Sequence, residues 1–259
     1  MNLAKEISIA RQAASAAGKI IKGMSLGEAL ITKKGKAEIV TDADLVAEKV
    51  ITDLIGRHFP GDGIITEESG EYNSTQERVW LIDPLDGTTN FARRFPFSCV
   101  SIALAIGKEP VVGVVFNPFM NEFFEAAKGG GAFLNGERIS VSRVQDLRES
   151  FLATGFSYDV QESPDRPIEI FRKMLLRSHS VRRPGSAAID MCYVACGIFD
   201  GFWEEGLKPW DTAAGVVLVR EAGGRLTTFD GAPYTPYDKT IVASNALLHD
   251  ALLEVLNST

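Results

Sequence analysis

The chain has 259 residues, 45% of them hydrophobic and 24% charged, which is the composition of a globular protein with a large buried core. No apolar run approaches the ~20 residues of a membrane-spanning helix, the first residues lack the apolar stretch of a signal peptide, and a formal net charge of −7 argues against general nucleic-acid binding. The three cysteines are an odd number in apolar surroundings, so we expect buried free thiols and a cytoplasmic protein.

Two helices are predicted at the start of the chain. Residues 2–22 carry apolar residues and alanines at helical spacing. Residues 41–58 predict a second helix, with Thr41 as its N-cap and Asp44 three positions later, as in a capping box. The residues expected on the buried side of this helix are Leu45, Ile51, Leu54 and Ile55.

Two short apolar strands follow. The first covers residues 64–65 and ends at Glu67, and the polar residues 71–78 are expected to form a loop. The second covers residues 79–82, four apolar residues that indicate a buried strand. Each strand is therefore followed directly by a carboxylate.

The second strand leads into a group of polar residues with chemical potential. Asp83 and Asp86 follow it with Pro84 between them, and proline removes a ladder donor, so we expect the strand to stop there. Asp86 and Gly87 then turn the chain, and residues 88–90 are suited to opening a helix. Acids bind cations and a helix N-terminus binds phosphate, which favours phosphoryl chemistry. An ordinary polar turn is the alternative.

Antiparallel strands are predicted next. Residues 100–106 alternate in polarity, residues 111–116 and 122–126 continue the pattern, and Asn135-Gly136 predicts a hairpin before residues 138–141. The polar residues 142–150 suggest a division into an N-terminal half, 1–145, and a C-terminal half, 146–259.

The C-terminal half mixes strands and helices. The predicted strands are 151–154, 198–203 and 240–244, and the predicted helices are 165–177, 187–196, 210–222 and 247–256. The three histidines are scattered, and no CxxC or HExxH pattern, nucleophile elbow or Walker loop occurs. A histidine-based zinc site or catalytic triad is therefore not expected.

Two more acids share the position of the central pair. Asp211 lies in the first turn of a helix entered through Pro209, and Asp44 lies in the first turn of its own helix. Each acid also has an ordinary interpretation, because an acid near a helix N-terminus is worth about 0.3–1 kcal/mol without any ligand. Spacing alone does not show that these acids meet in space.

The motifs together resemble the inositol monophosphatase family of metal-dependent, lithium-sensitive phosphatases. They are E-E-S (67–69), D-P-L-D-G-T-T-N-F (83–91), G-S-A-A (185–188), P-W-D-T-A-A-G (209–215) and E-A-G-G (221–224). The resemblance implies an α+β fold, a layered αβαβα sandwich of the inositol monophosphatase and sugar phosphatase type, and a homodimer.

The resemblance also assigns metal and catalytic roles. The implied ligands of two or three Mg²⁺ ions are Glu67, Asp83, Leu85 through its carbonyl, Asp86, Asp211 and, for the weaker third ion, Asp44. Glu67 and Thr88 would orient and deprotonate the attacking water, with Asp83 and Asp86 completing the catalytic group. The N–H groups of Gly87 and Thr88 would hold the phosphate.

The substrate is implied to be a small phosphorylated polyol or sugar. Its implied contacts are Gly87, Thr88, Arg183, Gly185, Ser186, Ala187, Glu204 and Asp211. Arg182 competes with Arg183, Glu205 competes with Glu204, and Lys33, flanked by Lys34 and Lys36, resembles a basic position over the site.

The expected function is Mg²⁺-dependent hydrolysis of myo-inositol monophosphate to inositol and phosphate. The alternatives are a broader sugar phosphatase, such as a fructose-1,6-bisphosphatase, and a regulatory partner of the transcription machinery.

Overall fold

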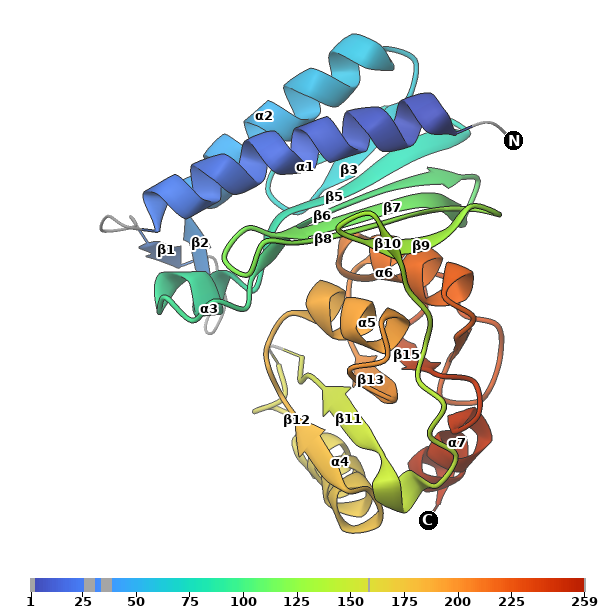
Figure 1. Ribbon diagram of the computed structural model, residues 1–259. Coiled ribbons are helices and arrows are strands. Elements are labelled where there is room, and N and C mark those ends of the chain that lie inside the picture. The colour runs from blue at the N-terminus through green and yellow to red at the C-terminus, as the bar shows by residue number, and fades with distance from the viewer. Residues whose placement is uncertain (1–2, 26–30, 34–38, 158, 259) are drawn as a thin grey trace.

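Five layers of secondary structure alternate in the computed structural model, which describes residues 3–25, 31–33, 39–157 and 159–258. As Figure 1 shows, α1 and α2 cover one face of an eight-stranded sheet, and α5 and α6 lie between this sheet and a five-stranded sheet. Two further helices, α4 and α7, cover the far side of the smaller sheet. The helices are α1 (Ala4–Met24), α2 (Asp42–His58), α3 (Thr88–Ala92), α4 (Asp165–Arg177), α5 (Ala187–Ala195), α6 (Pro209–Glu221) and α7 (His249–Asn257). The predicted αβαβα sandwich is confirmed.

The larger sheet has the strand order β10-β9-β8-β7-β6-β5-β3-β4. Its strands are β3 (Gly63–Thr66), β4 (Gly70–Tyr72), β5 (Arg78–Asp86), β6 (Cys99–Ile106), β7 (Glu109–Asn117), β8 (Glu122–Ala127), β9 (Gly131–Leu134) and β10 (Glu137–Arg138). The predicted hairpin is present: Asn135 and Gly136 have φ angles of 51° and 85°, as a type I′ turn requires. The strand expected at 138–141 is shorter than predicted, and β4 overlaps the first two residues of the expected loop 71–78.

The smaller sheet has the order β12-β11-β13-β15-β14. Its strands are β11 (Phe151–Thr154), β12 (Ser180–Arg182), β13 (Gly201–Glu205), β14 (Arg225–Thr227) and β15 (Thr240–Ser244). The short β12 and β14 were not predicted, because three residues carry too little periodicity to be recognised. A separate pair, β1 (Ile31–Lys33) and β2 (Ile39–Thr41), precedes α2. The core between the two sheets draws on both predicted halves, and the boundary at 145 stays a prediction.

Two expectations about local structure are wrong. Strand β5 does not stop at Pro84 but runs to Asp86, which pairs with Cys99 after a register shift that begins at Asp83. The irregular step accommodates the missing proline N–H. Leu45 is 54% exposed, because the buried face of α2 comprises Ala43, Asp44, Ala47, Glu48, Ile51 and Ile55. The buried face of α2 thus includes two carboxylates, those of Asp44 and Glu48.

Close packing sets the position of α6 against the large sheet. A Cβ atom on Gly113 of β7 would lie 2.4 Å from the carbonyl oxygen of Ala214 in α6, so only glycine allows this approach. On its other side α6 meets α5, where a Cβ on Gly215 would lie 2.7 Å from the Cβ of Met191. These contacts position the first turn of α6, which carries Asp211.

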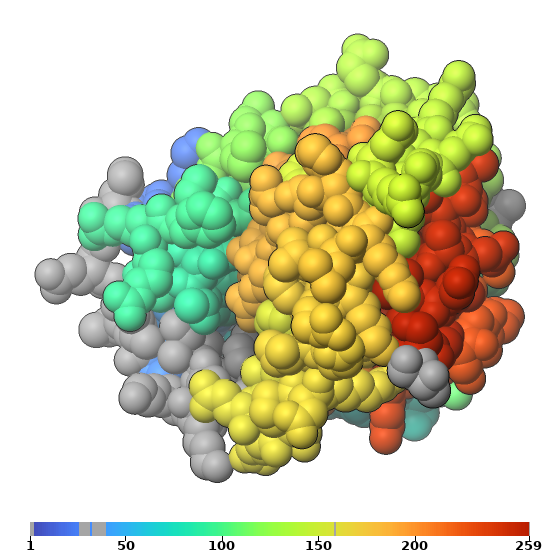
Figure 2. Space-filling model, turned by 90° about the horizontal axis from the view of Figure 1, so that it is seen from below, coloured from blue at the N-terminus to red at the C-terminus, as the bar shows by residue number. Residues whose placement is uncertain are grey.

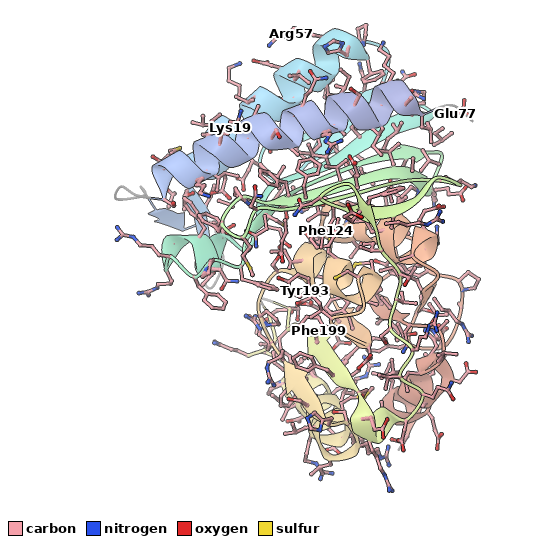
Figure 3. The ribbon with its side chains drawn as sticks, viewed as in Figure 1. Lys19, Arg57, Glu77, Phe124, Tyr193 and Phe199 are labelled. Carbon is pink, nitrogen blue, oxygen red and sulfur yellow. The ribbon has the colours of Figure 1, made fainter. Side chains whose placement is uncertain are left out.

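The interior between the layers is aromatic. Figure 3 shows Phe124, Tyr193 and Phe199 in the space between the two sheets. The ring centroids of Tyr193 and Phe199 are 5.6 Å apart, and those of Phe124 and Tyr193 are 6.4 Å apart. All three cysteines are free thiols as expected, and two of them are buried. None of the described helices is both long and apolar enough to cross a membrane.

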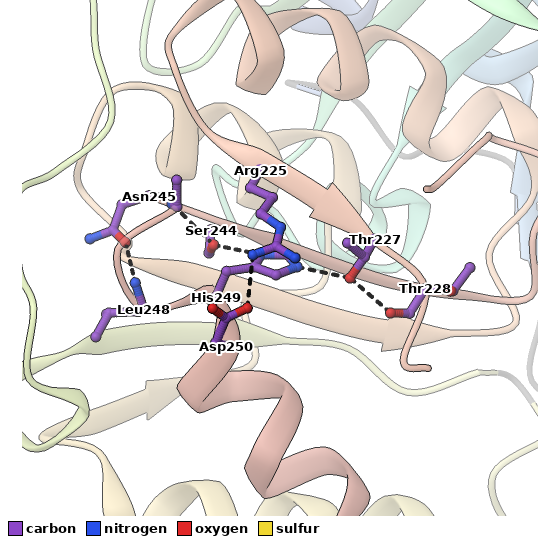
Figure 4. Close-up of polar contacts among 9 residues, drawn as sticks. Arg225, Thr227, Thr228, Ser244, Asn245, Leu248, His249 and Asp250 are labelled. Atoms are coloured by element: carbon purple, nitrogen blue, oxygen red, sulfur yellow. Dashed lines mark hydrogen bonds and ion pairs between the residues drawn. The ribbon is translucent and has the colours of Figure 1, made fainter. Parts of the chain in front are cut away.

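A buried histidine joins β14, β15 and α7 (Figure 4). His249 has no exposed surface, and its Nε2 and Nδ1 atoms lie 2.8 Å from Thr227 Oγ1 and Ser244 Oγ. Burial and, to a lesser extent, the charge of the nearby Arg225 lower the pKa of His249 to about 4. Arg225 is itself paired with Asp250. The neutral imidazole is therefore the form that the fold accommodates.

Candidate functional site

A cavity of 530 Å³ lies where the two halves of the chain meet. Figure 2 shows this side of the molecule, with the blue-green segment after β5 beside the orange and yellow segments of the second half. Asn90 joins them, because its Nδ2 donates to the carbonyl oxygens of Phe97 and Pro184 at 2.8 and 2.9 Å. The cavity wall includes the predicted residues Glu67, Asp83, Leu85, Asp86, Gly87, Thr88, Arg183, Gly185, Ser186, Ala187, Glu204 and Asp211.

Parallel pairing brings Glu67 and Asp83 to the same edge of the sheet. Strands β3 and β5 run parallel, with Thr66 opposite Ile82, so the residues that follow each position emerge side by side. The Glu67 N–H donates to the Ile82 carbonyl at 3.3 Å, which continues the pairing by one residue. The sequence indicated two strands ending in acids but not their relative direction.

Asp86 is held by the second half of the chain. Its Oδ2 atom accepts hydrogen bonds from Ser186 Oγ at 2.6 Å and from the Ala188 N–H at 2.9 Å, at the start of α5. Asp83 is 2% exposed, and its Oδ1 accepts from the Leu85 N–H at 2.9 Å. Both carboxylates therefore have fixed orientations.

The fourth acid comes from α6. Asp211 Oδ2 accepts from the Lys208 N–H at 2.7 Å, which caps the helix and holds the carboxylate at the cavity. Burial raises the pKa of Asp211 well above its ordinary value, and the charge of Asp86 adds to this effect. The expectation that an acid opens this helix is confirmed.

The carboxylates repel one another. Burial raises the pKa of Asp83 well above its ordinary value, with further contributions from the charges of Glu67, Asp86 and Asp211. Burial also raises the pKa of Asp86 to about 6, although the bonds from Ser186 and Ala188 oppose the shift. A bound cation would offset the repulsion among these carboxylates, and their hard oxygen atoms suit a divalent ion such as Mg²⁺. Within the described ranges, no group of three or more aspartate, glutamate, histidine or cysteine side chains has the arrangement of a metal-ion site.

Asp44 is not among the residues that line the cavity, unlike the other acids. It has no exposed surface, and its Oδ2 accepts from the Thr41 N–H at 2.8 Å, which confirms the capping box. Its Oδ1 accepts from Thr88 Oγ1 at 3.3 Å, and the same hydroxyl lies 3.0 Å from the Leu85 carbonyl. Burial raises the pKa of Asp44, while the bonds from Thr41 lower it. Its role as a ligand of a third ion stays a prediction.

The two arginines in question lie differently. Arg183 lines the cavity, whereas the Arg182 guanidinium lies 4.9 Å from the Phe151 ring centroid and donates to the Val181 carbonyl at 3.1 Å. Arg183 is thus the one placed to meet a substrate. The side chain of Lys33, and both Lys34 and Lys36, lie outside the described residues.

The two neighbouring glutamates, Glu204 and Glu205, also differ in their surroundings. Glu204 is 8% exposed, and its burial raises its pKa to about 8, with Arg183 opposing the shift. Glu205 also lines the cavity, but its carboxylate is paired with Arg166 at 2.7 Å. Glu204 is therefore the carboxyl group available to a ligand.

Three cavity residues were missed by the sequence analysis. Asp190 is 1% exposed and lines the cavity, and its Oδ1 has no hydrogen-bond partner in the described part of the chain. Gly155 makes room for Glu204, because a Cβ there would lie 2.1 Å from Glu204 Oε2. Asn90 was assigned only to a helix start. None of these roles has a local sequence signal, since each depends on a partner far along the chain.

Comparison with known proteins gives consistent matches. The model of the inositol monophosphatase family matches residues 2–259. Over 255 residues the chain is 45% identical to an inositol-1-monophosphatase of Synechocystis sp., covering 98% of this chain and 89% of that protein. Over 250 residues it is 45% identical to the Nus factor SuhB of Escherichia coli, covering 95% and 94%. A solved inositol monophosphatase structure from Anabaena (Nostoc) sp. matches with a TM-score of 0.91 at 44% identity, covering 99% of this chain and 96% of that one.

Proposed function

Because this chain belongs to the inositol monophosphatase family, we propose that it hydrolyses a phosphate monoester with Mg²⁺, and that the substrate is myo-inositol monophosphate. The observation that carries the proposal is the convergence of four acids, Glu67, Asp83, Asp86 and Asp211, on one cavity that Arg183 and Glu204 also line. A cavity with repelling acids at one end and groups for hydroxyl recognition nearby suits a phosphorylated polyol.

The acids and the Leu85 carbonyl would hold two or three Mg²⁺ ions, with Asp44 contributing to the third. When bound, the ions would lower the pKa of the attacking water and stabilise the leaving alkoxide. Thr88 would orient the water through its hydroxyl, which Asp44 and the Leu85 carbonyl already hold. Glu67 would take the proton, with Asp83 and Asp86 framing the reacting phosphate.

The substrate would lie across both halves of the chain. The N–H groups of Gly87 and Thr88 would hold the phosphate, and residues 185–187 would contact the inositol ring. Since the pKa of Glu204 is about 8, its carboxyl group is protonated at neutral pH and can both donate to and accept from a ring hydroxyl. Arg183 would contact the ring or the phosphate from the open side.

A panel of phosphate monoesters tests the proposal. With Mg²⁺ present we expect inositol monophosphates to have the highest kcat/KM, and we expect EDTA to abolish turnover until Mg²⁺ is restored. Full activity after exhaustive chelation would refute the metal mechanism. A higher kcat/KM for fructose 1,6-bisphosphate would make the protein a broader sugar phosphatase.

The family resemblance extends the proposal to a cytoplasmic homodimer that lithium inhibits. Sedimentation analysis and a LiCl titration of the Mg²⁺-activated protein test the dimer and the inhibition. A monomer at micromolar concentration, or undiminished activity in LiCl, would contradict these two points.

A second candidate function rests on the relative named Nus factor SuhB. We propose that this chain can also act as a regulatory partner of the transcription machinery. A pull-down with RNA polymerase and its elongation factors tests this role. Binding by a variant that has lost phosphatase activity would separate the two functions, and absence of binding would leave only the enzyme.

A further inference from the structure

Helix α2 carries two buried carboxylates on the face that it packs against the large sheet. Asp44 has no exposed surface and Glu48 is 3% exposed. They are four residues apart, so they lie on the same side of the helix, where like charges are unfavourable. Glutamate is seldom buried unless its carboxylate is well bonded. A pair of such residues at these positions therefore needs a reason beyond core packing.

One of these carboxylates contacts Thr88, and the other contacts the two residues that follow Glu67. Asp44 Oδ1 accepts from the Thr88 hydroxyl at 3.3 Å. Glu48 acts on the turn that follows β3: its Oε2 accepts from the Glu68 N–H at 3.0 Å, and its Oε1 accepts from the Ser69 hydroxyl. Helix α2 therefore contacts Thr88 directly through Asp44. Through Glu48 it contacts Glu68 and Ser69, the two residues that follow Glu67.

The turn is also held from the strand side. The Glu67 N–H donates to the Ile82 carbonyl at 3.3 Å, and the Ser69 N–H donates to Thr66 Oγ1 at 3.2 Å. Without Glu48, the Glu68 N–H and the Ser69 hydroxyl would lose their buried acceptor. This contact accounts for the serine of the E-E-S motif, because Ser69 donates its side-chain hydroxyl to Glu48.

We propose that Glu48 is a positioning residue: it fixes the turn 67–69, so that the Glu67 carboxylate is presented to the metal ions and the water, while Glu48 itself touches neither. The inference rests on the proposed function. Outer partners that orient a metal ligand typically contribute ~10–100-fold to metal affinity or activity. A purely structural contact would stabilise the fold without affecting metal binding.

The chain offers a matched control. Asp200 is 4% exposed and accepts from one backbone N–H, that of Phe151 at 2.7 Å, and from one serine hydroxyl, that of Ser142. This is the same bonding pattern as that of Glu48, but Asp200 is not among the residues that line the cavity. Glu48→Gln and Asp200→Asn therefore make comparable structural changes at different distances from the site.

The experiment measures Mn²⁺ binding to substrate-free protein by electron paramagnetic resonance, together with Tm, kcat and KM in Mg²⁺. We expect Glu48→Gln to weaken Mn²⁺ binding at least ~10-fold and to lower kcat with little change in KM. Asp200→Asn should lower Tm about as much as Glu48→Gln does, but it should keep the wild-type Mn²⁺ affinity. Ser69→Ala, which removes one bond only, should change Mn²⁺ affinity in the same direction by less, and it provides the test if Glu48→Gln fails to fold.

Unchanged Mn²⁺ affinity in both Glu48→Gln and Ser69→Ala would overturn the inference. Equal losses of Mn²⁺ binding in Glu48→Gln and Asp200→Asn would also overturn it, because they would indicate general loosening of the fold. A wild-type protein that binds no Mn²⁺ would instead refute the proposed function itself.

Discussion

Replacing Asp211 with asparagine separates its structural role from its chemical role. Asparagine has nearly the same shape, and its side-chain oxygen can still accept from the Lys208 N–H, as Asp211 does at 2.7 Å. What changes is the charge of the side chain. Burial, and after it repulsion from Asp86 and Glu67, disfavours that charge and raises the pKa of Asp211.

Two opposing terms determine the stability of the metal-free variant. Losing a negative charge at the start of α6 costs about 0.3–1 kcal/mol. Removing a charge that burial and repulsion disfavour returns about 1.4 kcal/mol for each unit by which the pKa is raised. Because the pKa of Asp211 is raised well above its ordinary value, we expect the second term to offset the first. About 1 kcal/mol corresponds to roughly 2–4 °C at this size. We expect the Tm of the metal-free Asp211→Asn variant to stay level or to rise by about 2–4 °C.

The difference in stability between the metal-free wild-type protein and Asp211→Asn should depend on pH. A carboxyl group whose pKa is raised by folding contributes stability below its unfolded value, near 3.8, and this stability is lost as the pH rises through the folded value. The wild-type protein should therefore lose more stability than Asp211→Asn between pH 4 and pH 8. In Mg²⁺, loss of an anionic ligand should cost several kcal/mol, which is a fall in kcat of at least ~100-fold.

Calorimetry in EDTA at both pH values and turnover in Mg²⁺ provide the measurements. Asp165, an exposed acid in the first turn of α4, is the matched control: Asp165→Asn should lower Tm slightly and leave kcat unchanged. A lower Tm with near-normal kcat in Asp211→Asn would show that Asp211 only stabilises its helix, and would refute the reasoning.

Three further changes have defined outcomes. Thr88→Ala should lower kcat by about 10²–10⁴-fold and Thr88→Ser should restore most of it, whereas equal activity in both would reduce Thr88 to a structural role. Gly155→Ala should displace the Glu204 carboxyl group and lower kcat/KM for inositol monophosphate as Glu204→Ala does; effects that simply add in the double variant would contradict this. Because folding lowers the pKa of His249 from 6.5 to about 4, its contribution to stability, about 3 kcal/mol, is complete above pH 6.5 and is lost as the pH falls to 4. Urea unfolding of His249→Gln should be less sensitive to pH in that window than wild type, and an identical pH dependence would contradict the assignment.

Local features of this protein could be predicted because they depend on neighbouring residues. The capping box of Thr41 and Asp44 and the turn at Asn135-Gly136 follow from backbone requirements that act within four residues. The same holds for the acid at the start of α6. Strand β5 was predicted less well, since the pairing of Asp86 with Cys99 carries it past Pro84.

The convergence of the acids was decided by tertiary structure. Glu67 meets Asp83 because β3 pairs parallel to β5, Asp86 is oriented by Ser186 from α5, and Asp211 is brought in by α6. Each of these arrangements depends on contacts between distant segments, whose free energy is not encoded in any short stretch of sequence.

The sequence by itself determined which residues can do chemistry, since the motifs carry the acids, Thr88 and the family resemblance. The tertiary structure decided how they are supported. Glu48 was indistinguishable from a surface glutamate in the sequence, and only the packing of α2 against the sheet buries its carboxylate beneath Glu68 and Ser69. Burial of a charge is a property of the assembled layers, because removing water from a side chain requires segments that are far apart in the sequence.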